Sequence, residues 1–170
     1  MSEYDVHFLR SSYREMLLEH LLAGEIMKHL WLAGHSSLEI LKPLVDDSGY
    51  DIVLESGNIV RHVQLKASFR GSTIRQFNIS RNLSTKPSGC VVCIRFDRDT
   101  LELGPFSFFG RAPGEPLPDL TQFKTTRHSK GNAQGIKNLR PNLRSVPLSQ
   151  FEVVATIPEL VERLFGPAPV

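Results

Sequence analysis

An aspartate, a glutamine and a lysine occupy positions that a β-hairpin would bring together. Asp51 precedes one apolar run, Gln64 and Lys66 lie in a second run, and the polar stretch 55–58 separates the two. If the turn centres near Gly57, Asp51 faces Gln64 directly, with Cβ atoms about 4.5–5.5 Å apart. Lys66 points to the same side because side chains alternate along a strand. One face of the predicted hairpin therefore gathers a carboxylate, an amide and an ammonium group.

These three groups suit metal-assisted hydrolysis of a phosphodiester. Carboxylate and amide oxygens are hard ligands for Mg²⁺ or Mn²⁺. Such an ion polarises the phosphodiester and lowers the pKa of a bound water. Lys66 would orient or deprotonate that water and stabilise the charge that develops on the phosphate. Each residue alone also has an ordinary interpretation: an aspartate before a strand is usually a turn residue, and a strand lysine usually faces solvent.

The segments Gly49-Tyr50-Asp51 and Gln64-Leu65-Lys66 resemble the PD-(D/E)XK phosphodiesterase superfamily, which includes restriction endonucleases and archaeal Holliday-junction resolvases. The resemblance covers about residues 11–96 and implies a restriction-endonuclease-like αβββαβ core. It also implies that Asp51, Gln64 and the backbone carbonyl of Leu65 hold Mg²⁺ or Mn²⁺, and that Lys66 is the motif lysine. Gln64 stands where most members have Glu or Asp, which removes one negative charge, so we expect weaker metal binding.

Many members of the superfamily also supply a glutamate from the first helix, and Glu25 is the candidate in this chain. On a helical wheel Glu25 lies among leucines, and a carboxylate on a largely apolar face requires a compensating metal or cation. We therefore expect it to join the catalytic and metal-binding residues. Glu15 and Glu19 lie on a different face, one helical turn apart, and are interpreted as solvated charges.

The elements that must position these residues follow from hydrophobic periodicity. Residues 11–33 predict a first helix, residues 80–85 a short helical stretch and residues 158–165 a last helix. Strands are predicted at 38–44, 50–54, 59–68, 75–79, 90–96, 106–109 and 151–156. This order predicts an α/β fold with a central mixed sheet flanked by helices. The first helix is apolar around most of its circumference, so we expect it to be packed on both sides.

The 170 residues fit one domain, with 41% hydrophobic residues to build its core. We expect a single nuclease-like domain over 1–170, with its core at about 11–96, a basic loop at about 112–147, and a C-terminal strand and helix at about 151–165. No signal peptide is visible and no run reaches about 18 apolar residues, so a cytoplasmic protein without a membrane segment is expected.

Positive charge is concentrated in one part of the chain. Residues 124–144 contain six Lys or Arg and no Asp or Glu, although the formal net charge of the chain is +2. We expect Lys130, Lys137 and Arg140 to contact the phosphate backbone of DNA, and Ser68 to add a contact from the active-site face. The alternative interpretation is a solvated loop without a ligand.

Cys90 and Cys93 have the spacing of a metal or redox pair, but they fall inside a predicted strand. Residues three apart on a strand point to opposite faces, so the two thiols cannot share a ligand there. We expect both to be buried in the core.

Three functions remain open from the sequence. The first is a metal-dependent DNA endonuclease in repair, recombination, a mobile element or defence, acting as a homodimer or as a subunit of a larger nuclease system. The second is a catalytically inactive nuclease fold that binds nucleic acid or protein, which Gln64 favours. The third is a protein-interaction domain in which Asp51 and Lys66 form only a salt bridge.

Overall fold

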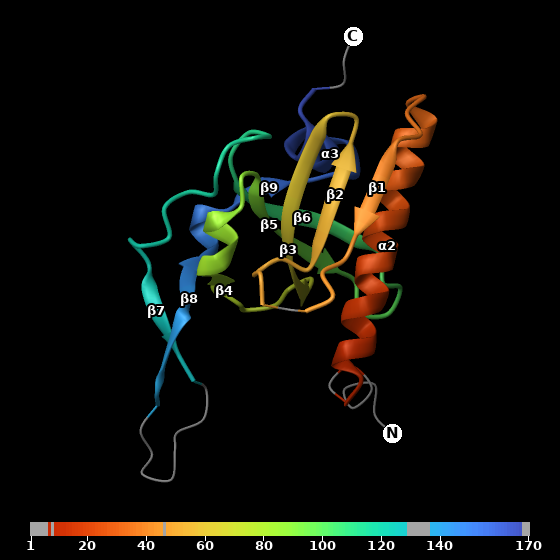
Figure 1. Cartoon of the computed structure of the whole chain (residues 1–170). Helices are drawn as coiled ribbons and strands as arrows, with labels where there is room; N and C mark the ends of the chain where they lie inside the picture. Colours follow the sequence, from red (N-terminus) through yellow and green to blue (C-terminus); the bar gives the residue numbers. More distant parts are fainter. Residues whose placement is uncertain (1–6, 8, 46, 129–136, 168–170) are drawn as a thin grey trace.

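A six-stranded mixed sheet forms the centre of the computed structural model, which describes residues 7, 9–45, 47–128 and 137–167 (Figure 1). In spatial order its strands are β1 (Leu38–Leu41), β2 (Ile52–Ser56), β3 (Ile59–Phe69), β5 (Gly89–Phe96), β6 (Leu103–Gly110) and β9 (Glu152–Val154). β3 and β5 run parallel, and the other neighbours pair antiparallel. The predicted α/β class with a central mixed sheet and flanking helices is confirmed.

Two helices cover one face of this sheet, α2 (Ser11–Leu32) and α3 (Ile157–Phe165). α2 buries an apolar residue at every fourth position, namely Leu18, Leu22, Ile26 and Leu30, which pack with the apolar residues of α3 over β2, β3, β5 and β6. Thr156 caps α3, because its hydroxyl oxygen accepts a hydrogen bond from the backbone N–H of Glu159. Both helices lie within two residues of their predicted bounds.

A second, three-stranded sheet covers the opposite face. Its order is β4 (Gln76–Ser80), β8 (Leu139–Pro147) and β7 (Lys124–Arg127). Phe77, Ile79 and Val146 from this sheet pack against Val91 and Phe109 of the central sheet. The expectation that residues 75–79 extend the central sheet is therefore wrong, since β4 pairs with β8. The basic segment is not a loop throughout either, because much of it forms β7 and β8.

The connection from β3 to β5 departs from the αβββαβ pattern. It contains β4 and the 3-10 helix η1 (Arg81–Thr85) where that pattern has an α-helix. Ser80 begins η1 by accepting a hydrogen bond from the N–H of Asn82. Lys86 ends it in an extended conformation, which is the preferred state of a residue before proline. The stretch between these two signals is too short for an α-helix of several turns.

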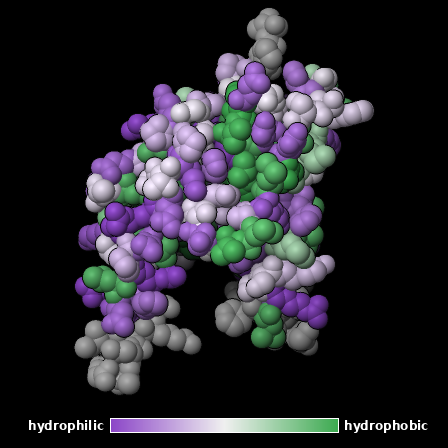
Figure 2. Space-filling model, in the orientation of Figure 1, coloured by the Kyte–Doolittle hydropathy of each residue, from purple (hydrophilic) through white to green (hydrophobic). Residues whose placement is uncertain are grey.

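The outer side of α2 is exposed. Tyr13, Met27 and Trp31 all face solvent, and Trp31 is 71% exposed. Beside the helix, Ile40 and Leu41 of β1 are also exposed, and Figure 2 shows apolar side chains gathered over β1 and β2. The expectation that α2 is packed on both sides is therefore wrong within the described part of the chain, where the sheet covers one side. In the described part of the chain, none of the helices is both long and apolar enough to cross a membrane.

The two cysteines lie on opposite faces of β5, as predicted. Cys90 belongs to the core under the helices and Cys93 to the core under the second sheet, and both are free thiols. Burial raises the pKa of each thiol to about 11. Neither is a candidate metal ligand or nucleophile, since both functions require the thiolate.

Candidate active site

The β2–β3 hairpin has the register predicted from the sequence. Ile52 pairs with Val63 and Ser56 pairs with Ile59, so Gly57 and Asn58 form a two-residue turn. Gly57 has a φ of +60°, which glycine adopts without a steric penalty. This register brings the residue before β2 opposite the middle of β3.

Asp51 directly precedes β2, at the point beyond which β3 has no neighbouring strand on that side. β3 continues to Phe69, well beyond the residue that pairs with Ile52. The backbone N–H of Asp51 donates to the carbonyl of Val63 at 2.9 Å, and its Oδ2 accepts the N–H of Leu65 at 2.5 Å. The N–H and C=O of one strand residue point to the same side. The Leu65 carbonyl therefore opens at the same edge as the Asp51 carboxylate.

The loop before Asp51 is held against η1 by a close approach of backbones. Gly49 has a φ of +81°, and a Cβ added there would lie 2.5 Å from Ser80 Oγ and 2.9 Å from the backbone nitrogen of Leu83. Asn82 Nδ2 also donates to the carbonyl of Asp47 at 2.7 Å. Only glycine fits this position without displacing η1.

Tyr50 fixes the same loop from the side of the second sheet. Its ring meets the ring of His62 edge-on, with 5.0 Å between centroids, and Lys86 Nζ lies 5.3 Å from the Tyr50 centroid. Burial lowers the pKa of His62, and the nearby Lys86 charge lowers it further. His62 is therefore neutral at pH 7 and packs as an aromatic ring.

Gln64, Lys66 and Ser68 share the face of β3 that the second sheet covers. Gln64 is 8% exposed, and its Oε1 accepts the N–H of Ser80 at 3.2 Å, which links β3 to the end of β4. Ser68 is 5% exposed, and its hydroxyl oxygen accepts a hydrogen bond from Arg95 at 2.5 Å. That burial does not fit the phosphate contact predicted for Ser68.

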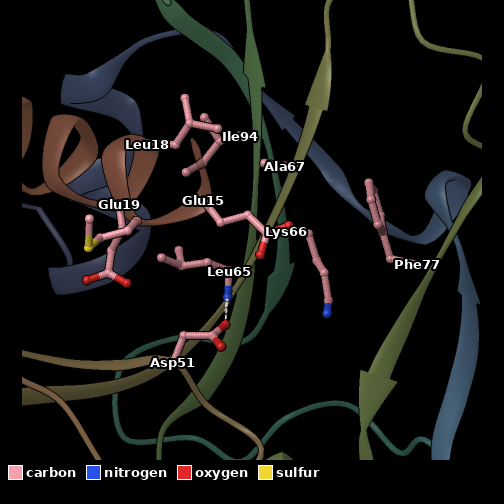
Figure 3. Close-up of a pocket in the computed structure, with 10 residues that line it drawn as sticks. Glu15, Leu18, Glu19, Asp51, Leu65, Lys66, Ala67, Phe77 and Ile94 are labelled. Atoms are coloured by element: carbon pink, nitrogen blue, oxygen red, sulfur yellow. Dashed lines mark hydrogen bonds between the residues drawn. The ribbon is translucent and has the colours of Figure 1, made fainter. Parts of the chain in front are cut away.

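A pocket of about 440 Å³ opens around the free edge of β3 (Figure 3). Its lining combines α2, the hairpin and the strands beside them: Glu15, Met16, Leu18, Glu19, Asp51, Leu65, Lys66, Ala67, Phe77 and Ile94. Figure 3 shows the two glutamates on the helix side of the strand and Lys66 extending on the other side. The structure thus brings Asp51 and Lys66 into one pocket and leaves Gln64 outside its lining.

The helix glutamates of the pocket are Glu15 and Glu19, not Glu25. The Glu19 side chain is only 16% exposed, and its Oε1 lies 2.6 Å from Lys42 Nζ, so its interpretation as a solvated charge is wrong. Glu15 is more open, with its Oε1 3.9 Å from Arg14 Nη2. A signal was present in the sequence, since both glutamates stand one helical turn apart beside the buried stripe of α2.

Glu25 does not join this pocket. Its carboxylate lies 3.4 Å from Lys28 Nζ, and its side chain is 46% exposed. It lies six positions beyond Glu19, which corresponds to about 9 Å along a helix axis and a different side of the helix. Lys28 supplies the compensating cation that the apolar surroundings of Glu25 require.

The oxygen donors at the β3 edge fit a hard divalent cation in part. Asp51 offers a carboxylate, Leu65 offers a carbonyl beside it, and Glu19 lies in the same pocket. Mg²⁺ usually takes one or two carboxylates and keeps several waters, so a small donor set is compatible with it. Within the described residues, no cluster of three or more His, Cys, Asp or Glu has an arrangement that would hold a metal. The amide oxygen of Gln64 is turned towards Ser80.

The predicted DNA-contacting cations lie away from this pocket. Lys137 is exposed just before β8, and Arg140 is exposed on β8. Lys130 lies outside the described residues.

Comparisons with known proteins do not assign the chain to a family. No protein-family model matches it, and no curated protein matches it. Among solved structures, a bacterial homing endonuclease matches with a TM-score of 0.30 and 16% sequence identity, over 69% of this chain and 82% of that chain. At that TM-score the likeness carries no argument about fold or activity.

We predict that Gly49→Ala is more damaging than Gly57→Ala. Both positions have positive φ, which costs an L-residue about 1–2 kcal/mol. Only Gly49 lacks space for a Cβ, which adds about 1–3 kcal/mol of overpacking and displaces the loop that carries Asp51. Urea denaturation of the two variants measures the difference in the free energy of unfolding. Equal losses would contradict the close approach of this loop to η1.

Proposed function

We propose that this chain is a metal-dependent DNA endonuclease of the PD-(D/E)XK type, which hydrolyses phosphodiester bonds in the pocket at the β3 edge. One observation carries the proposal: the Asp51 carboxylate accepts a hydrogen bond from the Leu65 N–H in a pocket that Lys66 and two helix glutamates also line. Carboxylates and an ammonium group around one strand edge suit a site that binds both a cation and a phosphate.

Asp51 and the Leu65 carbonyl would hold Mg²⁺ or Mn²⁺ at the strand edge. When bound, the ion would polarise the phosphodiester and lower the pKa of a water ligand. The hydrogen bond from the Leu65 N–H orients the carboxylate before any ligand arrives, and such preorganisation reduces the cost of binding. Asp51 is thus assigned as the principal metal ligand.

Lys66 would bind the phosphate and position the attacking water. It lies one residue beyond Leu65 and lines the same pocket, with its side chain extending on the other face of the strand. A fixed positive charge stabilises the negative charge that develops on the phosphate oxygens, and this stabilisation is strongest where water is excluded.

Glu19 replaces Glu25 as the proposed helix carboxylate. Its side chain is largely buried in the pocket, and Lys42 neutralises it there. An incoming cation would compete with Lys42 for the same carboxylate. Glu15, which is more exposed, would supply further negative charge at the mouth of the pocket.

Gln64 has two proposed roles. Its Oε1 already accepts the Ser80 N–H, which ties the second sheet to the strand that carries Lys66. A carbonyl oxygen has two lone pairs, so the same atom keeps capacity for a second partner such as the ion. Because the amide is neutral, it contributes less to cation affinity than the glutamate common at this position.

A catalytically inactive nuclease fold that binds nucleic acid is the second candidate. The observation that favours it is the burial of Gln64 outside the pocket lining, together with the small donor set at the strand edge. In both cases the chain would bind DNA as a homodimer or within a larger assembly, because one such pocket contacts one strand of a duplex.

We predict that wild-type protein cleaves DNA in Mg²⁺ or Mn²⁺ and that Asp51→Ala or Lys66→Ala lowers the rate about 10²–10³-fold. Each change removes a group whose effect on the transition state is electrostatic. Lys28→Ala, which removes an exposed cation of α2, is the control and should cleave at the wild-type rate. Linear, branched and single-stranded DNA are the substrates. If the wild type cuts none of them, the inactive-fold candidate replaces this proposal.

We also predict that Glu19→Gln weakens Mn²⁺ binding about tenfold or more, whereas Glu25→Gln leaves it unchanged. The two changes are chemically identical and lie on the same helix, but only Glu19 lines the pocket. Isothermal titration calorimetry of both variants with Mn²⁺ gives the two affinities. A larger loss for Glu25→Gln would reverse the assignment of the helix carboxylate.

A further inference from the structure

The outward face of the second sheet is polar, whereas its inward face contributes Phe77, Ile79 and Val146 to the core. On β4, Phe77 and Ile79 are buried, while the alternate residues Gln76 and Asn78 are exposed. Figure 1 shows β7 and β8 extending on the side of the molecule opposite α2. The core of the domain explains the inward residues of this sheet and leaves the outward ones without a role.

This outward face is hollowed, with a volume of about 660 Å³. Its lining contains amides, hydroxyls, two cations and one aromatic ring, and no Asp or Glu: Gln76, Asn78, Gln122, Phe123, Lys124, Thr125, Thr126, Arg127, Ser145 and Pro147. Such a lining suits a ligand that carries negative charge and also offers hydrogen-bonding edges.

Several polar groups in the hollow have unused hydrogen-bonding capacity. Thr126 Oγ1 donates to Asn78 Oδ1 at 3.0 Å, which orients the amide. Within the described residues, neither Asn78 Nδ2 nor the Gln76 amide makes a hydrogen bond, and the buried hydroxyl of Ser145 has no partner. One oriented amide, a second amide without a partner and an unsatisfied hydroxyl leave hydrogen-bonding capacity for a polar ligand.

Cations surround these amides without acidic partners. Lys124 lines the hollow, and Arg140 pairs across the strands with Thr126, so both side chains lie on the outward face; Arg127 also lines the hollow, from the other face of β7. Residues 124–151 contain no Asp or Glu, and none of these three cations forms an ion pair in the described part of the chain. Like charges in one patch repel each other, and a polyanion relieves that repulsion.

The β7–β8 pair is comparable with the two-stranded β-ribbons that enter a DNA groove. The major groove of B-DNA is about 12 Å wide and admits a two-stranded β-ribbon. The register of β7 against β8 shifts between Thr125 and Thr126, and such irregularities increase the twist of a ribbon. Asn and Gln side chains are the groups that recognise adenine through paired hydrogen bonds in this groove.

We propose that this face of the β4–β8–β7 sheet binds the major groove of duplex DNA, with Gln76 and Asn78 reading base edges and Lys124 and Arg140 holding the flanking phosphates. The inference rests on the proposed function, in that DNA is the substrate, and it adds sequence recognition at a surface separate from the pocket at the β3 edge.

Other nucleic acids fit this surface less well. The major groove of A-form RNA is too deep and narrow for side chains to read. Single strands are bound by stacking on aromatic rings. The one aromatic residue of the hollow, Phe123, already packs edge-on against Phe109 with 6.3 Å between centroids. Duplex DNA is therefore the partner that the polar and charged lining favours.

The test is selection of bound duplexes from a random-sequence pool by the full-length protein in EDTA, where metal-dependent cleavage is blocked. Wild type should recover a preferred sequence. Gln76→Ala and Asn78→Ala should each lose about tenfold discrimination at one or two base pairs. Asn58→Ala, which removes an exposed amide from the β2–β3 turn, is the matched control and should keep the wild-type preference.

The phosphate contacts have their own readout in salt titrations of binding. Alanine at Lys124 and Arg140 together should weaken every duplex alike and make the slope of log affinity against log salt shallower by about 0.9 per contact. Lys28→Ala should leave that slope unchanged.

Three results would overturn the inference: no preferred sequence from wild type, wild-type preference in both amide variants, or equal affinity for duplex RNA. Failure of the proposed function has a different signature. In that case the protein still selects a duplex sequence in EDTA, but it does not cleave that duplex when Mg²⁺ or Mn²⁺ is added.

Discussion

The hydrogen bond between the Leu65 N–H and the Asp51 carboxylate is the contact on which the candidate site depends. β3 extends past the start of β2, so its backbone groups at that edge have no neighbouring strand. An unsatisfied donor that is buried costs about 1–3 kcal/mol, and the Asp51 side chain supplies the missing acceptor. The same contact places the carboxylate beside the Leu65 carbonyl. A requirement of the fold and the geometry of a cation site therefore coincide at one residue.

The second sheet stabilises this corner of the molecule. Ser80, at the end of β4, donates its backbone N–H to Gln64 and packs against Gly49. The loop that leads into Asp51 is therefore held between β3 and η1. A neutral amide suits the buried position of Gln64, because an ionised carboxylate there would lose much of its hydration. The neutral side chain at position 64 therefore has a structural reason in this chain.

Local patterns in the sequence determined the hairpin and its register, because Gly57 and the alternation of side chains act within a few residues of each other. The rotation of α2 against the hairpin is a tertiary property, and a helical wheel does not contain it. This is why the helical wheel indicates Glu25 as the helix carboxylate although Glu19 faces the pocket. The sequence pattern does not predict β7 and β8, because the register shift after Thr125 interrupts the alternation on which strand prediction relies.

The most direct test of the account is a crystal structure of the protein soaked in Mn²⁺, with the ion located by its anomalous scattering. We predict a peak at the β3 edge, in direct contact with the Asp51 carboxylate and the Leu65 carbonyl, and its absence in Asp51→Ala. An ion bound elsewhere, or a peak unaffected by Asp51→Ala, would contradict it.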